Sequence, residues 1–207
     1  MEFNEVLGKI VIDNDLHARW LNTLSYMENA GARKISASES KDKVNIIILK
    51  HAAEEHRHAY YLKKQIGKVD GSLCRTYTNA ELLSPNSTKF YLQALDIAVC
   101  RYLKAQFNLK GEDLKFGAYL FVTYAIEVRA DELYPVYQQV LDVHRSKVNV
   151  KSIILEEEGH LEEMIAQLET FSADWKQHAA HVVEIEKALF NRWTAGLAKE
   201  VQPLEAV

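Results

Sequence analysis

The sequence of 207 residues contains little that interrupts a helix and little that builds a metal–thiolate site. It has three Pro, eight Gly and two Cys. So few helix breakers leave long uninterrupted segments, which favours an all-α fold. Cys74 and Cys100 form no Cys-x-x-Cys pair, which excludes a cysteine-ligated iron site or a zinc ribbon. We interpret both as ordinary thiols of a reduced protein.

Neither charge nor hydropathy indicates a nucleic-acid or membrane partner. The formal net charge is −4 and the pI is about 6.1, so nothing attracts the chain to nucleic acid or anionic lipid. The longest nearly apolar run, residues 116–126, is too short to span a bilayer. The first five residues, Met-Glu-Phe-Asn-Glu, lack the basic and apolar regions of a signal peptide. We therefore expect one cytoplasmic domain over residues 1–207.

Apolar residues recur at helical spacing along most of the chain. The pattern predicts helices over about 15–36, 41–66, 88–107, 112–143, 148–171 and 174–199. Either Asp13 or Asp15 can cap the first of these, and Val44 is expected on the inward face of the second. Residues 1–12 read as a short lead-in. Residues 68–87 contain Gly, Ser, Asn and Pro and read as an irregular connection with one helical turn near 80–83.

Two of these helices carry the motif Glu-x-x-His, at Glu55/His58 and Glu157/His160. Residues three apart lie on one face of a helix, so the carboxylate and the imidazole of each motif can bind a single cation. Two such motifs alone are close to what chance gives in a Glu-rich chain. The stronger signal is a further glutamate in an apolar helical stripe upstream of each motif, Glu28 before the first and Glu127 before the second. The order Glu…Glu-x-x-His therefore occurs twice.

Four carboxylates on inward helix faces predict bound cations. Isolated charges in an apolar core are costly, and each acid would otherwise shift its pKa until it is neutral. Two divalent cations balance four carboxylates, and the two histidines complete the coordination as neutral ligands. Mixed carboxylate and imidazole ligands suit iron or manganese. We predict two iron ions, with Mn/Fe or Mn/Mn pairs as alternatives, at Glu28, Glu55, His58, Glu127, Glu157 and His160.

Further polar residues near the motifs are candidates for an outer shell. A metal-bound His usually donates its other N–H to a carboxylate. Glu156 is expected to hold His58, Glu54 to hold His160, and Arg57 to pair with one of these acids. His51, Asp131 and Tyr124 are weaker candidates: His51 as an extra ligand or a hydrogen-bonded core residue, Asp131 as an alternative ligand or a surface acid. Tyr26, Tyr124 and Tyr134 are read either as electron relays near the metals or as core residues.

These residues resemble the ferritin-like superfamily of di-iron carboxylate proteins, which includes ferritins, rubrerythrins and bacterial di-iron oxygenases. The family order is Glu, Glu-x-x-His, Glu, Glu-x-x-His on four helices, and this chain matches it over about residues 15–170. The run 54–58, Glu-Glu-x-Arg-His, resembles the oxygen-activating branch. Gly159 stands where that branch usually has Arg, and Tyr124 where rubrerythrins carry an additional glutamate. The resemblance implies a four-helix bundle. The helix predicted over 88–107 lies in the crossover between its two halves, which departs from plain ferritin, and the helix predicted over 174–199 is a further addition at the C-terminal end.

The resemblance implies three classes of function. The first is a di-iron oxidase or oxygenase that uses O₂ or peroxide, a small organic substrate and an external electron donor, and a homodimer is expected. The second is an iron-handling protein, a ferroxidase or a peroxide-scavenging ferritin relative. The third is a non-catalytic helical module with a structural metal.

Overall fold

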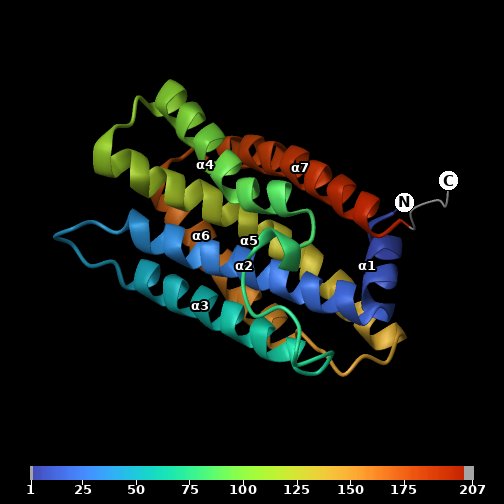
Figure 1. Cartoon of the computed structure of the whole chain (residues 1–207). Coiled ribbons are helices and arrows are strands. Elements are labelled where there is room, and N and C mark those ends of the chain that lie inside the picture. Colours follow the sequence, from blue (N-terminus) through green and yellow to red (C-terminus); the bar gives the residue numbers. More distant parts are fainter. Residues whose placement is uncertain (1, 203–207) are drawn as a thin grey trace.

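The computed structural model describes residues 2–202, which form seven α-helices, one 3-10 turn and no strand. The helices are α1 (Phe3–Ile12), α2 (Asn14–Ser38), α3 (Ile46–Ile66), α4 (Pro85–Phe107), α5 (Gly111–Val143), α6 (Lys151–Phe171) and α7 (Trp175–Glu200), and the turn η1 (Asn79–Glu81) precedes α4 (Figure 1). The predicted all-α fold is therefore confirmed. Within these residues no helix combines the length and the apolar character needed to cross a membrane.

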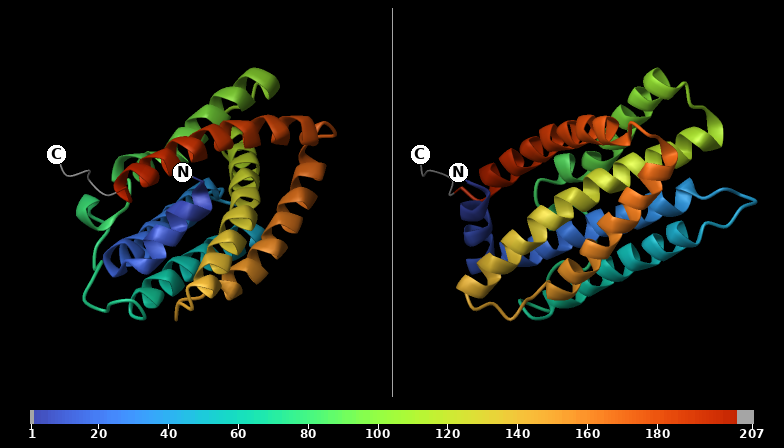
Figure 2. Two further views of the ribbon diagram at one scale, coloured as in Figure 1. Left: turned by 90° about the vertical axis from the view of Figure 1, so that its right-hand side faces the viewer. Right: turned by 180° about the vertical axis from the view of Figure 1, so that it is seen from behind.

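Four helices form the centre of the molecule. α2 packs antiparallel to α3, α5 packs antiparallel to α6, and the two pairs meet through α2 with α5 and through α3 with α6 (Figures 1 and 2). α4 and α7 pack against each other and against α5, and α4 also reaches α2. α1 lies across one end of the bundle, against α2, α5 and α7.

Two apolar clusters fill the interior, one toward each end of the four central helices. The first includes Leu7, Trp20, Leu24, Leu62, Leu133, Tyr137, Ile153 and Trp193. The second includes Ile35, Ile48, Ala52, Leu120, Ala125, Met164, Leu168 and Trp175. On each central helix the motif residues lie between these clusters: Glu28 follows Leu24 and precedes Ile35, and Glu127 follows Ala125 and precedes Leu133. Packed apolar layers therefore bound the acids on both sides and limit their access to water.

Side-chain caps set where the first two central helices begin. Of the two predicted caps, it is Asp13 that accepts a hydrogen bond from the Leu16 amide, at 3.0 Å, and starts α2. α3 begins at Ile46, later than the predicted residue 41, because the Asn45 side chain accepts from the amides of residues 47 and 48 at 3.0 and 3.3 Å. Val44, which we expected on the inward stripe, precedes the helix and is 72% exposed.

The prediction that residues 1–12 are only a lead-in is wrong. Residues 3–12 form α1, which buries Val6, Leu7, Ile10 and Val11 against the bundle. A ten-residue helix is marginal by itself, and most of its stability comes from tertiary packing of its apolar face. The end of the bundle supplies that packing surface.

His17 on α2 is a buried imidazole with one neutral partner. Its Nε2 lies 2.7 Å from the Tyr137 hydroxyl, and burial lowers the pKa of His17 to about 4. Because the unfolded chain binds this proton near pH 6.5, the stability contributed by neutral His17 is lost as the pH falls from about 6.5 to about 4. At about 1.4 kcal/mol per pH unit, we expect the free energy of unfolding to fall by up to about 3 kcal/mol from this group.

Urea unfolding of the wild type and of His17→Gln at pH 7 and pH 4.5 measures this contribution. The glutamine variant should lose less stability over the same interval, since it has no proton to gain. Equal losses in the two proteins would contradict the assignment to His17.

Candidate metal centre

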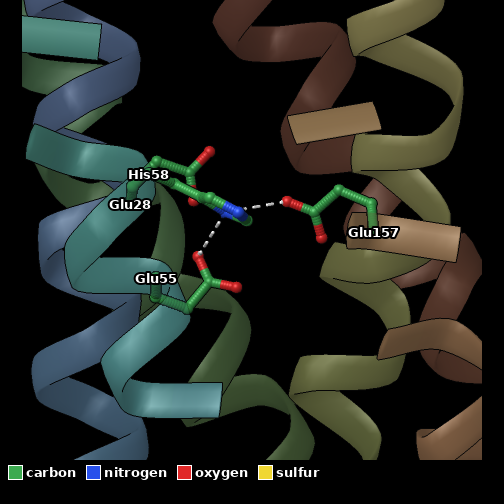
Figure 3. Close-up of side chains that lie close together, drawn as sticks. All are labelled: Glu28, Glu55, His58 and Glu157. Atoms are coloured by element: carbon green, nitrogen blue, oxygen red, sulfur yellow. Dashed lines mark ion pairs between the residues drawn. The ribbon is translucent and has the colours of Figure 1, made fainter. Parts of the chain in front are cut away.

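Six side chains from the four central helices converge at the junction of the apolar clusters. They are Glu28 on α2, Glu55 and His58 on α3, Glu127 on α5, and Glu157 and His160 on α6. They form two groups, Glu28/Glu55/His58/Glu157 and Glu55/Glu127/Glu157/His160, in each of which one ligand atom per residue lies within 4.8 Å of the others. Figure 3 shows the first group, in which side chains from α2, α3 and α6 point toward one another. This buried Glu/His group could hold a metal ion.

The two groups overlap in a definite way. Glu55 and Glu157 belong to both, whereas Glu28 and His58 belong only to the first and Glu127 and His160 only to the second. Glu55 and Glu157 stand at equivalent positions of the two motifs, so the doubled motif of the sequence has become an approximate two-fold arrangement in space. Shared carboxylates are what a pair of neighbouring ions would require.

Burial makes the ionised form of these acids unfavourable in free energy unless a positive charge lies nearby. Glu127 and Glu157 are each 2% exposed, and Glu55 is also buried. Glu28 is half-buried, and the Tyr134 hydroxyl donates a hydrogen bond to its Oε1. Four carboxylates this close repel one another, and little water reaches them to screen that repulsion.

Outer carboxylates hold the far nitrogen of each imidazole. His58 Nε2 lies 2.7 Å from Glu156 Oε2, and His160 Nε2 lies 2.8 Å from Glu54 Oε2. Each contact crosses between α3 and α6, as the motif spacing predicts. Arg57 donates to Glu156 Oε1 at 2.6 Å and lies 3.8 Å from Glu54 Oε1, so it neutralises this outer pair of acids.

The inner nitrogens of the imidazoles provide a test of whether a cation fits. With Nε2–H donated outward, each Nδ1 directs a lone pair at the carboxylates. His58 Nδ1 lies 3.1 Å from Glu157 Oε1, yet this buried atom has no hydrogen-bond partner within residues 2–202. His160 Nδ1 lies 3.1 Å from Glu157 Oε2 and 3.6 Å from Glu127 Oε2. Lone pairs that face one another this closely require a proton or a metal ion between them, so the residues fit a metal.

The pKa shifts show where protons collect when no cation is bound. Burial, together with the neighbouring charges of Glu28 and Glu157, raises the pKa of Glu55 well above its usual value. Burial and the Glu157 charge do the same for the pKa of Glu127. Burial disfavours charge on His160, but its bonds to Glu127 and Glu157 prevail and raise its pKa to about 11. Burial opposes ionisation of Glu157, yet bonds to His160 and His58 lower its pKa. The metal-free group therefore retains protons that a cation would displace.

Three of the weaker candidates lie outside the group. His51 is buried with both ring nitrogens engaged, Nε2 at 2.8 Å from Glu163 and Nδ1 at 3.0 Å from the Tyr119 hydroxyl, so it is a hydrogen-bonded core histidine. Asp131 is exposed on α5 and belongs to neither group. The Tyr124 ring packs against Trp175, 5.8 Å between centroids, on the side of α5 that faces α7. Tyr124 and Asp131 lie about one helical turn before and after Glu127, which places them beyond the two ends of the Glu/His group rather than in it.

Sequence reasoning did not identify Glu163 or Tyr119, which hold His51 from α6 and α5. Glu163 follows His160 by three residues and so lies on the same face of α6, which was the available signal. The Tyr119 hydroxyl reaches His51 across the helix bundle, from 68 residues along the chain, and no local pattern predicts such a contact.

A cavity of about 110 Å³, partly open to solvent, adjoins the Glu/His group. It is bounded by α2, α4, α5 and α7 and by Glu55 from α3, and its lining also includes Glu28 and Glu127. His58 and His160 do not line it; they face the group from the α3–α6 side. The helix in the crossover thus borders a space beside the acids.

The outer carboxylates allow a direct test of the imidazole geometry. We expect Glu156→Gln to weaken metal binding by about 10–100-fold, because the amide cannot orient His58 or raise its basicity as the carboxylate does. Glu162→Gln, at an exposed position of the same helix, is the matched control and should bind metal like the wild type. Competition against a chromophoric chelator measures both affinities, and equal values would show that Glu156 does not support a ligand.

Comparisons with known proteins found no relative of this chain: no protein-family model, no curated protein and no solved structure matches it. The likeness to di-iron carboxylate proteins therefore rests on the six residues and their arrangement.

Proposed function

We propose that this protein is a ferritin-like di-iron enzyme that uses O₂ to oxidise a small organic substrate. The observation that carries the proposal is the overlap of the two Glu/His groups at Glu55 and Glu157. A single structural ion needs only one group of four ligands. Two groups that share two carboxylates are suited to two adjacent ions.

Charge balance supports a pair of divalent ions. Glu28, Glu55, Glu127 and Glu157 carry four negative charges when ionised, and two divalent cations cancel them with both imidazoles neutral. Glu55 and Glu127 retain protons in the metal-free protein because burial raises the pKa of each, so the interior disfavours their negative charge unless positive charge accompanies it. Iron and manganese suit this mixture of oxygen and nitrogen donors, and iron is the metal we propose.

Each residue has a definite part in this scheme. Glu28 and His58 would complete the ligands of one ion, Glu127 and His160 those of the other, and Glu55 and Glu157 would serve both. Glu156 and Glu54 orient the imidazoles by accepting their Nε2 protons. Bound iron would supply the electrons that reduce O₂. In an oxygenase reaction one oxygen atom enters a C–H bond and the other leaves as water, with two electrons and two protons from an external donor.

The cavity favours an organic substrate over iron as cargo. Iron ions that enter for oxidation and storage need a hydrophilic path lined by acids. The space that reaches Glu28, Glu55 and Glu127 is lined mainly by apolar side chains, among them Met27, Val122 and Ile126. Such a lining repels hydrated ions and accepts apolar molecules.

Anaerobic titration with Fe²⁺ followed by O₂ tests the proposal. We expect about two Fe²⁺ to bind per chain, as in other paired carboxylate sites, and O₂ to produce a transient visible absorbance. Oxidation of many Fe²⁺ per chain, with a cage on size-exclusion chromatography, would instead identify an iron-handling protein. A metal-loaded protein that is inert to O₂ and peroxide but unfolds on chelation would identify a structural metal. Either of these two outcomes would overturn the proposed enzymatic function.

A further inference from the structure

The lining of the cavity beside the Glu/His group is elongated along two helices. On α2 it extends from Leu24 to Ser38, and on α5 from Tyr119 to Tyr134. At about 1.5 Å per helical residue each stretch measures roughly 20 Å. An extended molecule can therefore contact the lining along most of its length.

The apolar part of the lining comes from all four surrounding helices. It includes Met27 and Ile35 on α2, Leu92 on α4, Val122 and Ile126 on α5, and Phe190 on α7. A guest in this space would exchange water for apolar contacts over most of its length, which stabilises the bound state in proportion to the apolar area buried.

The cations that line the cavity among the described residues already have partners. Lys34 pairs with Asp96, and the Lys89 ammonium donates to Asn79 Oδ1 at 2.6 Å. Arg129 donates two hydrogen bonds to Glu186, at 2.9 and 2.8 Å. Without breaking an ion pair, an anionic guest could pair with Lys89 alone, whose partner is a neutral amide, and the carboxylates of the Glu/His group would repel that guest in the metal-free protein.

Most of the hydroxyl groups in the lining, though not those of Tyr26 and Thr123, are similarly engaged. Tyr91 donates to Glu186, Tyr134 donates to Glu28, and Tyr119 bonds with His51. Thr88 donates to the Leu83 carbonyl at 2.7 Å and accepts from the Trp193 indole at 2.9 Å. The wall thus offers few free polar groups, and a guest rich in hydroxyls or amides would lose hydrogen bonds to water without replacement.

Gly31 keeps the α2 wall of the cavity open. A Cβ built on this residue meets no atom within 4 Å, although Gly31 lies in the interior of a helix, where glycine is less favourable than alanine. Helix geometry does not require glycine here, and no neighbouring backbone approaches closely. The missing side chain leaves space beside Glu28, one helical turn away.

We propose that this cavity is a binding site for a neutral, extended, mainly apolar molecule, one end of which lies beside Glu28, Glu55 and Glu127. The role of this cavity as the substrate site rests on the proposed function, and neutral, extended, apolar molecules would then be the substrate class of the enzyme. The reacting carbon of such a molecule would reach the carboxylate side of the group, opposite the two histidines.

Binding of 1-octanol to the metal-free protein tests the site without any metal chemistry. Trp193 lines the cavity, so octanol should change the tryptophan fluorescence saturably at one equivalent per chain. Octanoate, equal in length but anionic, should bind at least about tenfold more weakly. Calorimetric titration provides the independent stoichiometry. No saturable octanol binding, or octanoate binding as tightly as octanol, overturns the proposal.

Gly31→Leu places a side chain in the open space and should weaken octanol binding at least about tenfold. Ala37→Leu adds leucine at an exposed position of the same helix and should bind like the wild type. Leu92→Phe, which narrows the cavity from α4, repeats the test if Gly31→Leu does not fold. Unchanged affinity in a folded cavity variant also overturns the proposal. A protein that binds octanol but is inert to O₂ would instead overturn the proposed enzyme and leave the binding site standing.

Discussion

Replacing Glu157 with Ala should abolish tight binding of both metal ions, not of one. Glu157 belongs to both ligand groups, and its two oxygens lie 3.1 Å from His58 Nδ1 and 3.1 Å from His160 Nδ1. Outer carboxylates around metal ligands are worth about 10–100-fold in affinity, so loss of a shared ligand should cost more than about 100-fold at each position. Metal analysis after dialysis, with chelator competition, measures the number and affinity of the ions that remain.

Two comparisons make this prediction specific. Glu158→Ala removes the adjacent, exposed carboxylate of α6 and should leave metal binding unchanged. Glu28→Ala removes a residue of one group only, so one ion should remain per chain. If Glu157→Ala and Glu28→Ala lose the same single ion, the two groups do not share Glu157 and the paired arrangement is wrong.

Metal-free protein should become less stable as the pH rises from 7 to 9, while metal-loaded protein should not. The folded state raises the pKa of Glu55 and of Glu127, and raises that of His160 to about 11 from a usual 6.5. A group with a raised pKa contributes stability that is complete below its unfolded pKa and is lost as the pH climbs toward the folded value. Each proton retained only by the folded state costs about 1.4 kcal/mol per pH unit.

Metal ions replace these protons and remove the penalty, so the gap between the loaded and metal-free melting temperatures should widen with pH. His160 alone contributes about 3 kcal/mol over two pH units, so we expect a widening of at least roughly 5–10 °C for a chain of this size. The interval from 7 to 9 lies above the titration of His17, which acts below pH 6.5. Metal-free Glu127→Gln has one titrating acid fewer and should show a shallower decline. A pH-independent gap would contradict proton–metal competition in the cluster.

Much of the fold follows from local signals in the chain. The helix periods, the Asp13 cap and the scarcity of Pro and Gly predict the central helices to within a few residues, except that α3 starts five residues later than expected. Residues 1–12 were not recognised as a helix, because a short helix depends on the surface it packs against. The six residues of the Glu/His group were also predictable, since a spacing of three on a helix fixes which side chains share a face.

Other features were decided only when helices distant in the chain packed together. The contacts of Glu156 with Arg57 and His58 join residues 99 and 98 apart, and only the approach of α6 to α3 creates them. The packing of the helices also decides that Glu55 and Glu157 belong to both groups. It leaves Asp131 exposed and places the Tyr124 ring against Trp175. Gly31 indicates open space at one point on α2, but the cavity as a whole is the space left where side chains of several helices fail to meet, which only tertiary packing decides. Local spacing thus determined which residues face inward, and tertiary packing decided what they face.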